Sequence, residues 1–134
     1  MLIDSSGLVA IVLNEDDAPK IVAALETSEF VYVTPIVIYE AAMAVARVRV
    51  MSLERATDIV QQFCQALNAN CIAIGEDMAI EALGAASRFG KGRHKAQLNM
   101  GDCFSYAAAK TLAVPLLFKG DDFSLTDIMQ AKTL

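Results

Sequence analysis

The sequence predicts an α/β fold in which a central parallel sheet is covered by helices on both faces. Four short apolar or β-branched runs, typical of strands buried on both faces, alternate with longer segments of helical periodicity. Strands separated by helices favour parallel pairing, because each return to the same end of the sheet needs a crossover. The length of 134 residues suits one domain with its own core, so we expect a single domain over residues 1–134.

The apolar runs place the four expected strands at residues 1–3, 30–33, 71–74 and 116–118. Six helices are expected between them, over residues 6–13, 18–27, 36–49, 52–68, 76–89 and 101–113. Pro19 and Pro35 fall where the first turn of a helix tolerates proline, and Ser52 suits an N-cap. Gly90 and Pro115 follow helical segments and indicate where those helices end.

The composition is more apolar than that of an ordinary soluble domain. Apolar residues make up 55% of the chain and the mean hydropathy is +0.43, which leaves apolar surface for a second copy or a hydrophobic partner. No apolar run reaches the roughly 18 residues of a membrane span, and the first residues do not resemble a signal peptide. We therefore expect a cytoplasmic protein without a membrane partner.

The cysteines indicate neither a disulfide framework nor a zinc site. Cys64, Cys71 and Cys103 are odd in number and include no Cys-x-x-Cys pair. We expect all three thiols to be small core residues in a reducing compartment.

Three carboxylates directly follow expected strands. Asp4 comes after the first strand, and Asp121 and Asp122 follow the last strand in "LLFKGDDF". Ligands of open parallel sheets bind beyond the carboxyl ends of the strands. These acids can therefore meet at one edge of the sheet.

Two further acids lie in apolar helical segments. Asp102 falls in the first turn of "NMGDCFSYAAAK", where a negative charge can simply stabilise the helix terminus. Glu40 is the only acid in "TPIVIYEAAMAVARV", and an isolated carboxylate in such surroundings needs a cation. Arg47, seven residues later on a similar face, is one candidate for that cation, and a metal ion is the other.

Four carboxylates gathered at one edge would repel each other unless a divalent ion neutralised them. Oxygen ligands suit Mg²⁺ or Mn²⁺ rather than Zn²⁺. Such a site most often serves phosphate chemistry, and hydrolysis of a nucleic-acid backbone is the natural candidate. The only histidine, His94, excludes histidine-rich metal sites and has no nucleophile elbow beside it, and the glycine motifs of nucleotide-binding loops are absent.

A basic segment, "RFGKGRHKAQLN", precedes Asp102 and contains no acid. Its charged and titratable members are Arg88, Lys91, Arg93, His94 and Lys95. The net charge of −5 opposes binding to a phosphate polymer, but this segment concentrates positive charge beside a candidate site residue. We interpret it as an RNA-guiding loop, with an ordinary solvated loop as the alternative.

Together these segments resemble the PIN domain, and specifically the VapC toxins of prokaryotic toxin–antitoxin pairs. The motifs "IDSS", "TPIVIYEAA", "NMGDCFSYAAAK" and "LLFKGDDF" occur in family order over nearly the whole chain. The resemblance implies a three-layer α/β/α sandwich with a central parallel sheet, and a magnesium-dependent endoribonuclease with Mn²⁺ as the other candidate ion. Transfer RNA is the commonest substrate class of that family. The resemblance also implies a homodimer and a VapB-like antitoxin whose C-terminal segment lies over the active site.

Carried over by position, the resemblance makes Asp4 and Asp102 the principal metal ligands, and Glu40 completes the acidic cluster. Ser6 matches the small polar position that assists through its hydroxyl. These assignments rest on four motifs together, because no single motif is specific.

The fourth catalytic acid is assigned to Asp122, because the related subgroup keeps an acid directly before the phenylalanine, here Phe123. Asp121 remains the alternative, acting through water. Two other functions stay open: a catalytically silent module that binds RNA or protein, and a magnesium-dependent phosphatase. The phosphatase is disfavoured because it would want Asp-x-Asp after the first strand, where this chain has Asp4 followed by two serines.

Overall fold

A parallel four-stranded sheet runs through the centre of the protein in the order β3-β2-β1-β4. The structure is a computed structural model that describes residues 1–131. Its strands are β1 (Leu2–Ile3), β2 (Val31–Val33), β3 (Ala69–Cys71) and β4 (Leu116–Leu117). The chain moves outward from β1 to β3 and returns to the opposite side of β1 with β4. The strand order therefore reverses between β1 and β4, and open parallel sheets bind ligands at the carboxyl ends of such strands.

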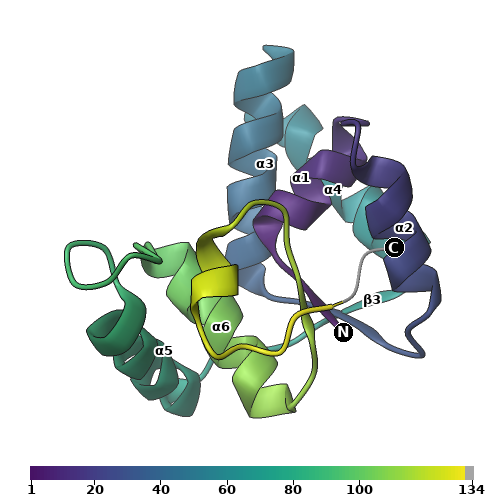
Figure 1. Ribbon diagram of the computed structural model, residues 1–134. Helices are drawn as coiled ribbons and strands as arrows, with labels where there is room; N and C mark the ends of the chain where they lie inside the picture. Colours follow the sequence, from purple (N-terminus) through teal and green to yellow (C-terminus); the bar gives the residue numbers. More distant parts are fainter. Residues whose placement is uncertain (132–134) are drawn as a thin grey trace.

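Helices cover both faces of this sheet, which confirms the predicted three-layer α/β/α class. Their bounds are α1 (Ser5–Val12), α2 (Ala18–Glu26), α3 (Pro35–Arg49), α4 (Leu53–Ala66), α5 (Glu76–Phe89) and α6 (Met100–Leu112). In Figure 1, α1 to α4 lie on one side of the sheet, and α5, α6 and the C-terminal segment lie on the other. A short 3-10 helix, η1 (Asp122–Leu125), follows β4. Within residues 1–131, every helix is too short or too polar to span a bilayer.

Alternating side chains of the short strands divide the core between the two faces of the sheet. Ile3 and Leu117 pack with helices α1 to α4, whereas Leu2 and Leu116 pack with α5 and α6. Leu2 pairs with Leu116 in register, and Ile3 pairs with Leu117. Each face therefore receives a matched apolar pair from the adjacent strands β1 and β4, which is why these strands are apolar at every position.

The third strand differs from its prediction over residues 71–74, because β3 comprises Ala69–Cys71. This strand lies at the edge of the sheet and is only partly buried, so it lacks the apolar run on which the prediction relied. Ile72 and Ile74 pack against the α5–α6 side of the core after the strand has ended. The expectation for Cys71 is wrong for the same reason: its thiol is exposed, whereas Cys64 and Cys103 are buried as expected.

The C-terminal segment is bound to β4 and to α6. Leu116 exchanges backbone hydrogen bonds with Met129 (2.8 Å) and Ala131 (2.9 Å). The Tyr106 hydroxyl, on α6, donates to Asp127 Oδ1 (2.5 Å). These contacts fix the segment that follows β4 and carries η1.

Candidate active site

Asp4 lies where the strand order reverses, directly after β1 and before α1. Its backbone N–H donates to the carbonyl of Leu117 in β4 (2.9 Å), and its side chain caps α1. Only 2% of Asp4 is exposed. The carboxylate is thus buried beyond the carboxyl ends of β1 and β4.

Hydroxyl and amide groups satisfy the Asp4 carboxylate. Oδ2 accepts from the Ser6 backbone N–H (3.1 Å) and from the Ser6 hydroxyl (2.7 Å). Oδ1 accepts from the Ser105 hydroxyl of α6 (2.6 Å). The Ser6 oxygen also accepts from the backbone N–H of Lys119 (3.0 Å). Among residues 1–131 no ion pair reaches Asp4, so its charge is hydrogen-bonded but not neutralised.

Asp102 occupies the first turn of α6, as predicted. It forms a capping box with Asn99: Asp102 Oδ2 accepts from the Asn99 backbone N–H (3.0 Å), and Asn99 Oδ1 accepts from the Asp102 backbone N–H (2.9 Å). Burial raises the pKa of Asp102 to about 6, the bond from Asn99 opposes that rise, and the charges of three other acids add to it. Those acids are Asp4, Asp122 and Glu40. Asp102 does stabilise the N-terminus of α6, but burial and repulsion from the other acids affect its pKa more than this capping does.

Glu40 reaches the same site from α3 by lying over a glycine of α6. A Cβ atom placed on Gly101 would stand 2.2 Å from Glu40 Oε2 and 2.6 Å from its Cδ. Any side chain at position 101 would therefore displace the carboxylate. Burial raises the pKa of Glu40, the charge of Asp4 adds to the rise, and the Ser5 hydroxyl opposes it.

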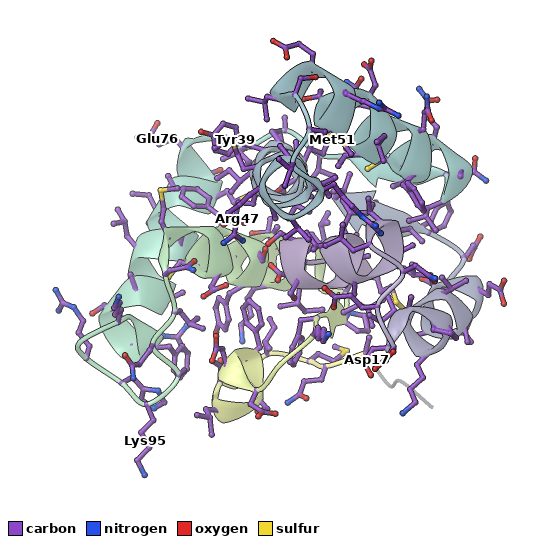
Figure 2. All side chains as sticks on the ribbon, turned by 90° about the horizontal axis from the view of Figure 1, so that it is seen from above. Asp17, Tyr39, Arg47, Met51, Glu76 and Lys95 are labelled. Atoms are coloured by element: carbon purple, nitrogen blue, oxygen red, sulfur yellow. The ribbon has the colours of Figure 1, made fainter. Side chains whose placement is uncertain are left out.

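Arg47 does not neutralise Glu40 in this structure. Over residues 1–131 no ion pair joins the two side chains, and Arg47 is exposed. Figure 2 looks along α3 and shows Arg47 projecting on the side of that helix that faces α1 and α6. The alternative in which Glu40 is held by a protein cation is therefore not supported.

The two acids after β4 differ in their relation to the site. Asp122 begins η1, and its charge contributes to the raised pKa of Asp102. Both acids are exposed, but Asp121 is not among the acids that act on Asp102. Phe123 is buried and packs against Phe118, with ring centroids 5.0 Å apart, which anchors η1. The charge acting on Asp102 is the one difference that separates Asp122 from Asp121, and the choice between them stays a prediction.

The basic segment forms a loop between α5 and α6 that is closed by a bridge between Gly90 and Leu98. Lys91, Arg93 and Lys95 are exposed on it, and Figure 2 shows Lys95 pointing away from the rest of the molecule. These three cations are available to a partner, and the loop that carries them leads into the first turn of α6, where Asp102 lies.

Two other members of the basic set already have protein partners. Arg88 donates to the Tyr106 hydroxyl (2.9 Å) and stacks over the ring of Phe89. His94 Nδ1 accepts from the Ala96 backbone N–H (3.1 Å), and its ring meets that of Phe89 edge-on. Both side chains thus help to hold the loop against the ends of α5 and α6.

The acidic site has the donor chemistry of a hard divalent cation, because its side chains offer only oxygen and the buried charge of Asp4 lacks a counter-ion. Within residues 1–131, no three acidic, cysteine or histidine side chains gather closely enough to form a metal-binding group by themselves. Mg²⁺ usually takes one or two protein carboxylates and keeps several waters. The donor set therefore suits such an ion only if water supplies most of its ligands.

Two residues of this site were missed by sequence reasoning. Ser105 is bonded to an acid 101 positions away in the sequence, and Gly101 provides the space that Glu40 fills. The only sequence signal for Ser105 is its position three residues after Asp102, which places both on one side of α6. Gly101 carries no signal, because a glycine in the first turn of a helix has several ordinary explanations.

Comparisons with known proteins find the same family from the sequence. The PIN domain family profile matches residues 1–129. A VapC ribonuclease of Rhizobium meliloti is 36% identical over 138 residues, which cover 94% of this chain and 97% of the relative. Ribonuclease VapC30 of Mycobacterium tuberculosis is 38% identical over 128 residues, which cover 96% of this chain and 95% of the relative.

Two solved structures share the fold at low sequence identity. The crystal structure of Mycobacterium tuberculosis VapC20, a sarcin–ricin loop cleaving toxin, has a TM-score of 0.76 and 13% identity, covering 96% of both chains. A toxin–antitoxin complex from Klebsiella pneumoniae contains a chain with a TM-score of 0.70 and 17% identity, covering 99% of this chain and 98% of that one. At these identities the likeness concerns the fold alone.

Replacing Asp102 by Asn is expected to stabilise the metal-free protein near neutral pH. The folded-state pKa of about 6 lies above the ordinary value of 3.8, so this group's contribution to the free energy of unfolding is complete below pH 3.8 and is lost as pH rises through about 6. Since Asp102 is partly exposed, we expect a gain of about 1 kcal/mol at pH 7.5 and a smaller gain at pH 4.5.

Urea unfolding in the presence of EDTA, at both pH values, measures this difference. The control is Asp58→Asn on the exposed face of α4, which should change stability by less than about 0.5 kcal/mol. A gain in Asp102→Asn that is equal at both pH values, or a loss at pH 7.5, would contradict the assigned cause.

Proposed function

The chain belongs to the PIN domain family and to its VapC ribonucleases, and from that premise we propose that it is a toxin of a type II toxin–antitoxin pair that cleaves RNA phosphodiester bonds with Mg²⁺. Mn²⁺ is the second candidate ion. The observation that carries the proposal is the buried Asp4 carboxylate, which has no cationic partner among residues 1–131 and whose charge helps to raise the pKa of both Glu40 and Asp102. A single PIN domain over residues 1–134 and a cytoplasmic location are part of this proposal.

The four acids divide the work by their positions. A bound divalent ion would supply activation of the attacking water and compensation of the negative charge that develops on the phosphate. Asp4 and Asp102 would hold it, because they are the two most firmly oriented carboxylates: Asp4 accepts three hydrogen bonds and Asp102 is fixed by its capping box. Glu40 and Asp122 would orient waters at the rim of the site, and Asp121 would act through water if at all.

RNA would reach the acids from the basic loop, where Lys91, Arg93 and Lys95 are exposed. Contacts of cations with phosphates give affinity without sequence preference, so the loop guides the substrate and leaves the choice of cleavage site to RNA shape. Arg88, in the last turn of α5, and His94, in the middle of the loop, complete the proposed set and also hold the loop through their contacts with Tyr106 and Phe89. We take transfer RNA as the substrate class, on the basis of the family resemblance.

Exposed apolar side chains on two helical surfaces fit the proposed protein partners. One surface lies on α3 and α4, and the other is an apolar groove of about 630 Å³ between α5 and α6. The first contains Tyr39, Met43, Val48 and Leu53, and the second is flanked by Ile80, Leu83 and Met100. A homodimer and a VapB-like antitoxin would cover surfaces of this kind.

The alternative function is a catalytically silent PIN module that binds RNA or protein. It is favoured by one observation, that no three ligand side chains within residues 1–131 are already gathered as a metal-binding group. The two functions differ in whether metal and RNA together lead to bond cleavage.

The deciding experiment is cleavage of total cellular RNA by antitoxin-free protein in Mg²⁺, with the new 5′ and 3′ ends mapped. We expect discrete cuts that EDTA abolishes and that Asp102→Asn abolishes, because that variant loses a ligating charge while keeping the capping box geometry. Circular dichroism of the variant controls for folding. Absence of cuts from folded, metal-binding wild-type protein would favour the silent module.

Gly101→Ala should impair cleavage without unfolding the protein. The new methyl group would displace the Glu40 carboxylate, which is the flexible end of a side chain, so we expect a loss of about 10- to 100-fold in cleavage rate and a stability change within about 1 kcal/mol. The matched control is Gly84→Ala in α5, where an added Cβ meets nothing within 4 Å. Equal cleavage rates for the two variants would remove Glu40 from the catalytic set.

Reversing the charges of Arg93 and Lys95 to Glu should weaken RNA binding and flatten its salt dependence. Binding is measured in the Asp102→Asn background, so that the RNA is not cut, at several salt concentrations. Each lost phosphate contact should reduce the slope of log affinity against log salt by about 0.7. The control is the double variant Lys20→Glu and Arg55→Glu, which makes the same charge change at exposed positions of α2 and α4. Equal effects of the two double variants on RNA binding would show that the loop is an ordinary solvated surface.

A further inference from the structure

The hydrogen bonds to Asp4 leave only one place for a further ligand. An ionised carboxylate offers about four lone-pair positions, two on each oxygen. Oδ2 accepts from both the backbone N–H and the hydroxyl of Ser6, so both of its positions are used. Oδ1 accepts from Ser105 at 2.6 Å, so one of its positions remains.

We propose that Ser105 is a positioning residue that, together with Ser6, restricts Asp4 to binding a divalent cation through Oδ1 alone. This inference rests on the proposed metal-dependent function and extends it to the choice of metal. Ser105 would not touch the ion or the RNA; it would act by fixing the plane of the carboxylate and by occupying the second position of Oδ1.

Ser105 suits this role because burial within a helix holds its hydroxyl in place. The residue is 1% exposed and lies in the middle of the apolar α6, so its hydroxyl has little freedom to turn toward water. It is also three residues after Asp102, one turn along the same helix. The bond from Ser105 to Asp4 therefore links the N-cap of α1 directly to α6, the helix that carries Asp102.

Binding through a single oxygen has a consequence for metal selectivity. Mg²⁺ prefers six ligands in nearly octahedral geometry and keeps several waters, whereas Ca²⁺ takes six to eight oxygens and often binds carboxylates through both. A carboxylate with Oδ2 fully used cannot provide the second oxygen. Ser105 holds the carboxylate in the orientation in which Ser6 fills Oδ2. Without that bond the carboxylate could turn and offer both oxygens, so the two hydroxyls together favour the smaller ion.

The test is direct metal binding without RNA, by titrating Mn²⁺ into the protein with electron paramagnetic resonance detection and displacing it with Mg²⁺ or Ca²⁺. The variants are Ser105→Ala, which removes the donor, and Ser105→Cys, which keeps nearly the same volume with a weak donor. Ser87→Ala, an exposed serine of α5, is the control. Near-ultraviolet circular dichroism and thermal unfolding report whether each variant keeps the native fold.

We expect Ser105→Ala to bind Mn²⁺ about tenfold or more weakly and to show a narrower preference for Mg²⁺ over Ca²⁺, with Ser105→Cys between it and the wild type and Ser87→Ala unchanged. A role in packing alone would lower the unfolding temperature of Ser105→Ala and leave the preference between the two ions in place, and that result would overturn the proposal. Equal Mn²⁺ affinity in Ser105→Ala and wild type would overturn it as well. If the wild type binds no Mn²⁺ at all, the metal-dependent function itself fails and this inference fails with it.

Discussion

The buried charge of Asp4 is the constraint on which the rest of the site depends. A carboxylate that is almost fully removed from water is costly unless its oxygens are hydrogen-bonded and its charge is compensated. The protein meets the first requirement with donors from two distant segments, Ser6 in α1 and Ser105 in α6. No side-chain cation among residues 1–131 compensates the charge of Asp4. The acids of α3, α6 and η1 add further negative charge to the site.

Helix termini supply the partial compensation that the fold itself offers. Asp4 caps the N-terminus of α1, and Asp102 lies in the first turn of α6, where the aligned peptide dipoles favour negative charge. The topology brings both termini to the carboxyl ends of β1 and β4, because the strand order reverses there. Burial and repulsion between the acids nevertheless raise the pKa of Asp102 to about 6, so these two effects exceed the stabilisation by the helix dipole.

The features that could be predicted from the sequence are those that depend on hydrophobic periodicity or on a charge isolated among apolar residues. The helices and strands β1, β2 and β4 follow from apolar runs, and Asp4 and Glu40 stand out because each interrupts an apolar segment. The bounds of β3 do not follow, because two of its three residues are exposed and it contains no continuous apolar run. Ser105 and Gly101 do not follow either, because their roles depend on one hydroxyl bond and one close approach between segments that are joined only by the folded topology.

The acidic site therefore lowers the stability of the free protein, because its carboxylates are buried and repel each other. The rest of the described chain is consistent with its fold. Side chains cap α3, α4 and α6, strands β1 and β4 present matched apolar pairs to each face, and no buried side-chain polar atom in residues 1–131 lacks a hydrogen-bond partner. Against that background, acids that repel each other at one point cannot be explained by folding, because neutral side chains of the same size would cost less there. A ligand that binds the folded state and supplies positive charge would return the lost stability in proportion to its affinity. The unfavourable electrostatics of the free site would thus provide the driving force for the proposed cation binding.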